Sequence, residues 1–241
     1  MTLTPEAKSL AMTLIEGAMK TIRNADELFD EARLLAGAGH IARALLLHQI
    51  SLEECGKSEM LYVSVAAVLR GQAVDLRKLK RAFSRHEAKN NTNAYFLPRS
   101  EGEVTALEQN DTEAAADAFG EVREAFHKDS NTLKNASLYV DFDGAFRAPG
   151  EAITTEQLTE VLNRNGEFMS MALDKIRLLT RWATDLDAAA NEVATLWSTL
   201  GMDELDRKKP ETYEAFQKRL DGMLGSLDES ASELGRLAPD A

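Results

Sequence analysis

The feature that most constrains the fold is an apolar repeat of helical period in the first part of the chain. Between residues 5 and 36, apolar side chains recur every three or four positions: Leu10, Leu14, Ala18, Ile22, Ala25, Phe29, Ala32 and Leu35. Thr4 and Pro5 suit the N-cap and the first helical turn, and "GAG" at residues 37–39 favours a helix end. A second helix should then occupy residues 40–69. Two long helices joined by a tight turn pack antiparallel, so the sequence predicts a helical hairpin.

Helical patterns continue through most of the remaining chain. We expect a third helix from its N-cap Asp75 to about residue 90, a fourth at about 112–133, and a long one from about 155 through 187 and on toward 200. The stretch at 91–111 looks irregular.

The segment "ASLYVDFDGAFRAPGEAIT" at residues 136–154 is aromatic and rich in turn residues. It predicts an extended connector folded onto the bundle, without a convincing strand pair. The fold class expected from these patterns is all-α, a bundle of five or six helices. Residues 1–200 would form this domain, and residues 201–241 an acidic appendage with one short helix after Pro210 and a fraying end.

Composition limits the environment and the partners of the chain. The 241 residues carry a formal net charge of −12, so binding of nucleic acid would require a local basic patch. The single cysteine, Cys55, excludes an internal disulfide and fits a reducing compartment. The N-terminal residues do not resemble an export signal, and no apolar run approaches the roughly 18 residues of a membrane span. We therefore expect a cytoplasmic protein without membrane contact.

Charged residues interrupt the most apolar predicted helix at residues 51–60, "SLEECGKSEM". Charged side chains are rarely buried unless they are paired. Glu54 falls on a face of apolar and small residues, whereas Glu53 and Lys57 have the spacing and orientation of a favourable helical ion pair. Gly56 lowers helix stability by about 1 kcal/mol relative to alanine, which a close approach by another helix or a ligand would explain. A solvated stripe and a polar pocket inside the bundle both remain open interpretations.

The predicted third helix is strongly basic. It holds one acid, Glu87, and six basic residues: Arg77, Lys78, Lys80, Arg81, Arg85 and Lys89. Helical spacing places His86 one turn beyond Phe83 on the core-facing stripe, from where it could reach the charged segment of the second helix. A lone histidine is commonly structural, and basic residues commonly form a solvated face. An imidazole, fixed cations and a carboxylate can, however, together cleave RNA without a metal, and Arg81 and His86 have R-x4-H spacing.

Three segments together resemble the AbiV-type abortive infection proteins of bacteria, a branch of the HEPN helical domains. They are "ARALLLHQISLEECGK", "FSRHEAK" and "LKNASLYVDFDGAFRAPGEAIT", and the likeness covers about residues 5–180. The resemblance implies a helical bundle that commonly dimerises. Many HEPN domains are metal-independent endoribonucleases whose R-x4-6-H motifs meet across a dimer interface. AbiV-type proteins sense a phage product and shut down translation.

The resemblance also implies roles for individual residues. His86 would act as general acid or base, and Glu54, next to Glu53, would hold a cation or the imidazole. Three residues would stabilise negative charge: Arg81, Lys57 and Lys89. The basic character of the predicted third helix, and not the resemblance, suggests four further residues that would bind RNA: Arg77, Lys78, Lys80 and Arg85. Tyr139 and Asp141 match an element expected to be structural. No metal or cofactor is implied, and the expected partners are a second copy of the chain, RNA and a phage-encoded activator protein.

Two other functions fit parts of the sequence. Glu124 and His127 form an E-x-x-H pair, as di-iron bundles use, although the chain has no second E-x-x-H and His127 is expected to be exposed near a helix end. Alternatively, the protein is a non-catalytic dimeric module that binds a phage protein or the translation machinery. A nuclease requires an accessible His86 on which Arg81 or Lys89 converges, whereas a scaffold would seal His86 against Glu53 or Glu54.

Overall fold

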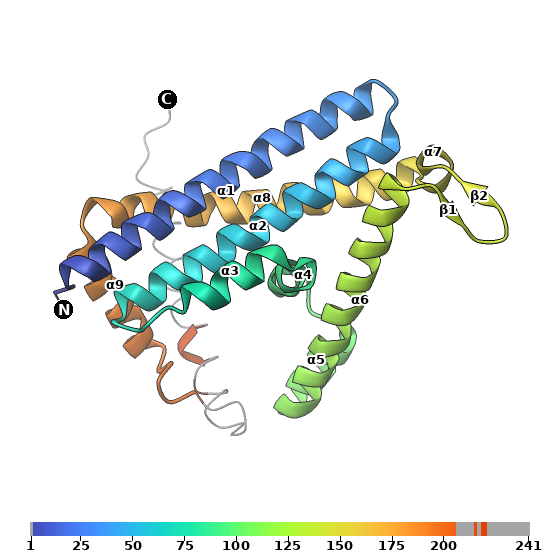
Figure 1. The fold of residues 1–241 in the computed structure, drawn as a ribbon. Coiled ribbons are helices and arrows are strands. Elements are labelled where there is room, and N and C mark those ends of the chain that lie inside the picture. The colour runs from blue at the N-terminus through green and yellow to red at the C-terminus, as the bar shows by residue number, and fades with distance from the viewer. Residues whose placement is uncertain (1, 206–214, 216–217, 221–241) are drawn as a thin grey trace, which may run out of the picture. The chain divides into compact units, whose positions relative to one another are not determined.

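The computed structural model describes residues 2–205, 215 and 218–220, and it confirms an all-α protein (Figure 1). Within these described residues, five helices have fourteen residues or more: α1 (Pro5–Gly37), α2 (Ile41–Leu69), α6 (Thr112–Leu138), α8 (Thr155–Thr184) and α9 (Leu186–Thr199). The shorter elements are α3 (Leu76–Ser84), α4 (His86–Asn93), the 3-10 turn η1 (Ala94–Phe96), α5 (Glu101–Glu108), α7 (Pro149–Ala152), and the strands β1 (Asp141–Phe142) and β2 (Phe146–Arg147). The short helix expected after Pro210 lies mostly outside the described residues.

The predicted N-terminal helical hairpin is confirmed. Thr4 caps α1 by accepting a hydrogen bond from the backbone N–H of Ala7, and Pro5 occupies the first turn. Gly39 adopts a φ of +82°, which a residue with a Cβ rarely tolerates, and so permits the turn into α2. Figure 1 shows α1 and α2 side by side and antiparallel.

The chain divides into two compact units. The first comprises residues 1–98 and 120–190, and α2 is its central helix because α1, α4 and α8 all pack against it. All six residues from 51 to 56 are buried, so the middle of α2 has no solvated face. The second unit comprises residues 99–119 and 191–241. Within it, Ser100 and Glu103 form a capping box that starts α5.

Three expectations about local structure are wrong. The basic third helix is broken at Arg85, whose φ of −107° and ψ of 120° are extended, so α4 starts afresh at His86. Residues 91–111 are largely helical, since they include the end of α4, η1 and α5. The last long helix is interrupted at Asp185, whose carboxylate accepts hydrogen bonds from the N–H groups of Asp187 and Ala188 and thereby caps α9.

The connector after α6 contains a small exposed hairpin, so the expectation that it holds no strand pair is wrong. Its last part, α7, packs against α2. Strand β1 pairs antiparallel with β2, and Phe142 lies opposite Phe146. These two side chains are 62% and 78% exposed. Gly144 has a φ of +73° at the turn. No helix in the described part of the chain has an apolar stretch long enough to cross a membrane.

A polar contact lies inside the core between α1, α2 and α8. His48 is fully buried, its Nδ1 is 3.1 Å from the side-chain amide nitrogen of Asn165, and the ring of Phe29 packs edge-on against it. Ser51 donates a hydrogen bond to the carbonyl oxygen of Ala25 on α1. Burial disfavours the imidazolium and lowers the pKa of His48 to about 4.

Gly56 marks the closest approach between α2 and α4. A Cβ on Gly56 would lie 2.8 Å from the carbonyl oxygen of Lys89 and 3.0 Å from Oδ1 of Asn93. We predict that Gly56→Ala lowers the free energy of unfolding by about 1–3 kcal/mol, because the backbone of α4 must move. Gly166→Ala is the matched control, since its Cβ would meet nothing within 4 Å and a helical alanine should stabilise by up to about 1 kcal/mol. Urea denaturation measures both, and equal stabilisation by both substitutions would contradict the close approach.

His48 should make stability depend on pH. Its pKa in the folded state, about 4, lies below the ordinary value of 6.5, so between these values the unfolded chain binds more protons than the folded one. Stability should therefore be unaffected by His48 above pH 6.5 and should fall by up to about 3 kcal/mol as the pH drops toward 4. His48→Leu should remove this component of the pH dependence, whereas His40→Leu, at an exposed helix cap, should retain it. Identical slopes for wild type and His48→Leu would refute the assignment.

Candidate functional site

The carboxylate of Glu53 is the centre of the charged cluster. Glu53 lies in the middle of α2, and its side chain is only 7% exposed. Lys89 of α4 donates to Oε2 at 2.6 Å, and Lys134 of α6 donates to Oε1 at 2.9 Å. Nδ1 of His86, at the start of α4, is 2.8 Å from both carboxylate oxygens. A single buried carboxylate thus connects three helices of the first unit.

The three partners of Glu53 keep it ionised. Burial alone would raise the pKa of this carboxyl group. Hydrogen bonds from Lys89, Lys134 and His86 together outweigh burial, and the pKa of Glu53 lies below its ordinary value. With two lysines beside one carboxylate, the cluster carries net positive charge even when His86 is neutral.

His86 is held at one side and open at the other. Its side chain remains 54% exposed although Nδ1 contacts Glu53. An ionised carboxylate accepts hydrogen bonds, so Glu53 favours a proton on Nδ1 and leaves the lone pair of a neutral ring on Nε2. The predicted convergence of His86 with the charged segment of α2 is therefore confirmed. Its partner is Glu53, and His86 starts the separate helix α4 instead of continuing the basic third helix.

Helix α4 presents a stripe of polar side chains to its neighbours, chiefly to α2. His86, Lys89, Asn90 and Asn93 recur at helical spacing, and the last three are buried. Nδ2 of Asn93 donates to the carbonyl oxygen of Leu52 at 2.6 Å. The missing side chain of Gly56 gives α4 the space to reach this position. The close approach expected at Gly56 is thus confirmed.

The remaining charges of the segment at residues 51–60 are also paired. Lys57 donates to Glu54 on the same helix, and its ammonium group lies 6.0 Å from the ring centroid of Phe83. The pair expected between Glu53 and Lys57 therefore does not form. Glu59 pairs with Lys175 of α8. These charges are paired with one another inside the bundle, so the solvated-stripe interpretation is wrong.

Most of the other sequence-predicted residues lie on α3, and Arg85 lies at the break that follows it. Arg77, Lys78, Lys80, Arg81 and Arg85 are all exposed. Arg85 lies 3.7 Å from the carboxylate of Glu87. The backbone N–H groups of Lys78 and Arg77 donate hydrogen bonds to the carboxylate of Asp75 and lower its pKa, and the charge of Arg81 lowers it further. Tyr139 is exposed at the end of α6, and Asp141 belongs to β1. Cys55 is buried, which raises the pKa of its thiol to about 12 and makes it a poor nucleophile.

Sequence reasoning missed Lys134. It lies in the "LKNAS" part of the segments that carry the resemblance, but no spacing rule connects residue 134 with residue 53. His127 was expected near a helix end and exposed; it instead lies within α6, partly buried, with Nδ1 3.3 Å from Nδ2 of Asn90. Across the described residues, no three His, Cys, Asp or Glu side chains are grouped so that they could hold a metal ion.

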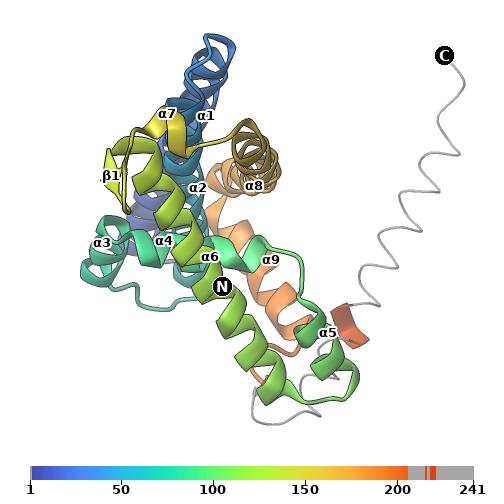
Figure 2. The ribbon, with the colours of Figure 1, turned by 90° about the vertical axis from the view of Figure 1, so that its right-hand side faces the viewer.

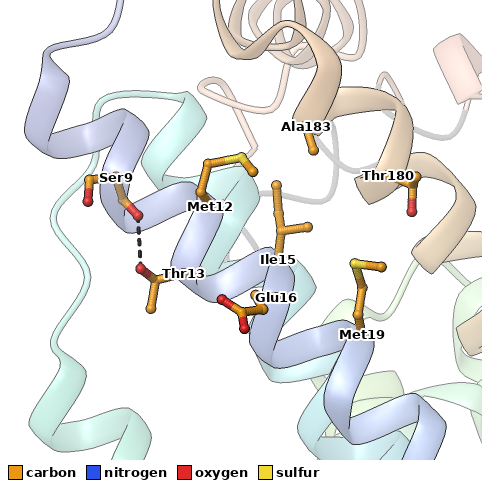
Figure 3. A pocket seen from close by; sticks show the side chains of 8 residues that line it. All are labelled: Ser9, Met12, Thr13, Ile15, Glu16, Met19, Thr180 and Ala183. Atoms are coloured by element: carbon orange, nitrogen blue, oxygen red, sulfur yellow. Dashed lines mark hydrogen bonds between the residues drawn. The ribbon is translucent and has the colours of Figure 1, made fainter.

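A groove of about 390 Å³ lies between α1 and α8, and none of the residues discussed above lines it. Figure 3 shows the side chains of Met12, Ile15 and Met19 on α1 facing Thr180 and Ala183 on α8. The other lining residues are Ser9, Thr13 and Glu16. Among the residues that line the groove, Glu16 alone is ionisable. The Glu53 cluster combines a carboxylate, an imidazole and two lysines, so it is the better candidate for chemistry.

Removing the central charge should destabilise the fold. We predict that Glu53→Gln lowers the free energy of unfolding by about 3–5 kcal/mol, because the substitution leaves the buried Lys89 and the partly buried Lys134 without a carboxylate. Glu87→Gln, in an exposed pair with Arg85, should change it by less than about 0.5 kcal/mol. Chemical denaturation at neutral pH compares the two. A loss below about 1 kcal/mol for Glu53→Gln would show that the three helices do not depend on this carboxylate.

Comparison with known proteins agrees with this geometry. The family model of AbiV, among the HEPN domains, matches residues 13–170, more than half of the chain. The chain is also 41% identical over 114 residues to the uncharacterized protein y4gJ of Sinorhizobium fredii, and the match covers 47% of this chain and 59% of that relative. No solved structure matches the chain. The matched region contains α2, α4 and α6, and thus the entire Glu53 cluster, and the chain belongs to the AbiV family of HEPN domains.

Proposed function

We propose that this protein is a bacterial abortive infection protein that halts translation in phage-infected cells by cutting RNA without a metal ion. The observation that carries the proposal is the Glu53–His86 pair, in which a buried, ionised carboxylate holds one nitrogen of a half-exposed imidazole. Family membership supports a role in abortive infection. We further propose that the protein acts in the cytoplasm, as a homodimer, and that a phage-encoded protein activates it.

His86 would act as the general base. Its Nε2 takes the proton from a ribose 2′-hydroxyl, and the resulting oxygen nucleophile attacks the adjacent phosphorus. The bond from phosphorus to the 5′ oxygen breaks, and this oxygen takes up a proton from solvent. The products are a 2′,3′-cyclic phosphate and a 5′-hydroxyl end, so no oxidant or metal is required.

The surrounding charges would assist this reaction in different ways. Lys89 is buried and bonded to Glu53, so it positions the carboxylate and does not touch substrate. Arg81 and the partly exposed Lys57 would stabilise the charge that develops on the phosphorane, and Glu54 would hold Lys57. The exposed cations of α3 at residues 77, 78 and 80, together with Arg85 just beyond its end, would bind the RNA backbone.

A non-catalytic module is the second candidate, and one observation favours it. Glu53 already accepts hydrogen bonds from three side chains, and two of these are lysines that are 13% exposed or less. Such a cluster would also serve to fix α4 and α6 on α2. In that case α3 would be a docking surface for a protein.

Replacing His86 separates the two functions. We predict that His86→Ala lowers RNA cleavage by about 10²–10⁴-fold, because it removes the proton acceptor. The control is His40→Ala, which alters an exposed histidine whose side chain makes no capping hydrogen bond. The measurement is induced expression followed by sequencing of cellular RNA ends, with translation monitored in parallel. New cyclic-phosphate ends in wild type and His40→Ala, but not in His86→Ala, would support the nuclease. Arrested translation without new ends in wild type would favour the binding module, and new ends in a folded His86→Ala protein would refute the role of His86.

A further inference from the structure

The hairpin after α6 carries a concentrated patch of exposed apolar side chains. Five large apolar residues are exposed within nine positions: Leu138, Tyr139, Val140, Phe142 and Phe146. The rings of Phe142 and Phe146 pack against each other, with centroids 5.0 Å apart. Arg43 of α2 donates to the carbonyl oxygens of Ser137 and Leu138, both at 3.3 Å, and so anchors the base of the hairpin. An exposed aromatic patch of this kind is characteristic of an interaction surface.

Helix α3 has complementary properties. None of its residues is buried, and its apolar stripe of Leu76, Leu79 and Phe83 is partly open to solvent. From residue 76 to residue 86 the chain has five cations and no carboxylate. The hairpin has the opposite balance, with two aspartates, Asp141 and Asp143, against one arginine. Each surface therefore offers the apolar side chains and the charge that the other would bind.

The two surfaces belong to the same unit but do not cover each other. Both are exposed in one copy of the chain, and Figure 1 shows them apart along α2. Figure 2 shows the hairpin and α3 on the same side of α2. A second copy related by a two-fold axis on that side could place its hairpin on α3 of the first while receiving the first copy's hairpin on its own α3.

We propose that two copies of this chain associate by exchanging these contacts, each hairpin seating on α3 of the other copy. The proposal specifies the surfaces of the dimer proposed above and rests on that part of the proposed function. It commits to a second copy because both complementary surfaces occur on one chain and a two-fold exchange satisfies both without leaving an open end. RNA alone would leave the aromatic hairpin and the apolar stripe uncovered, and it would compete with the hairpin of the second copy for Lys78 and Lys80.

The buried area is sufficient for a stable dimer. Three aromatic side chains and two aliphatic ones, mostly exposed in one copy, would lose on the order of 400 Å² per hairpin. Two hairpin–helix contacts, counted on both partners, then bury about 1,600 Å², which is the standard size for specific complexes. Because α3 ends just before Arg85 and His86, the incoming hairpin would also lie beside the Glu53 cluster of its partner.

The apolar part of the contact is tested by replacing the two phenylalanines. Wild type should have twice the mass of one chain in light scattering coupled to gel filtration at micromolar concentration. Phe142→Ser with Phe146→Ser should weaken the dimer by at least about 30-fold, as expected for aromatic residues at an interface centre. Leu34→Ser, which alters an equally exposed leucine on α1, should leave it unchanged. A monomeric wild type, or a dimer that survives the double serine change, would overturn the proposal.

A charge exchange tests the reciprocal arrangement. One variant carries Lys78→Glu and Lys80→Glu, and the other carries Asp141→Lys and Asp143→Lys. Each should be monomeric alone, because like charges oppose in both contacts, and a mixture should form a one-to-one heterodimer. Two variants that stay monomeric when mixed, or that each dimerise alone, would refute the exchange. Association is measured without RNA. A dimer that forms through these surfaces but does not cleave RNA would therefore refute the nuclease and leave the dimer interface confirmed.

Discussion

The arrangement of α2, α4 and α6 depends on the burial of one ionised carboxylate. Removing a carboxylate from water is strongly unfavourable unless its oxygens are hydrogen-bonded to opposite charge. Glu53 meets this requirement only when Lys89 and Lys134 are both in place, and these residues come from helices far apart in sequence. A buried ion network of this kind contributes little net stability over an apolar core, but it excludes arrangements in which a partner is missing. Its contribution is therefore to fix how the helices pack.

The same network determines what His86 can do. The imidazole shares the Glu53 carboxylate with two lysines, so its orientation is set by groups that are themselves buried. A general base gains from such fixed orientation, because its reacting nitrogen does not have to be positioned at the moment of proton transfer. The lysines also compensate the negative charge of Glu53, so the exposed side of the cluster favours an anion such as a phosphodiester. In the proposed reaction, Glu53 would therefore have both a structural and a chemical role.

Sequence predicted those features that depend on local rules. The periodicity of α1 and α2, the caps at Thr4 and Asp75, and the close approach at Gly56 all follow from residue type and spacing, and each is confirmed. The caps at Ser100 and Asp185 follow the same rules and could have been recognised. By contrast, the choice of Glu53 over Glu54 as the partner of His86, and the participation of Lys134, are set by how α4 and α6 lie on α2. Helical spacing within one segment contains no information about such contacts.

The break at Arg85 shows how tertiary contacts override a local pattern. Residues 76–93 contain no proline or glycine, and a single helix would be expected. The apolar stripe of α3 and the polar stripe of α4 nevertheless require different surroundings, since Lys89, Asn90 and Asn93 reach their partners only when α4 lies directly on Gly56. The extended backbone of Arg85 allows α4 to take that position independently of α3. One consequence is the completed Glu53 cluster; the other is a basic, partly apolar α3 that remains open to a partner.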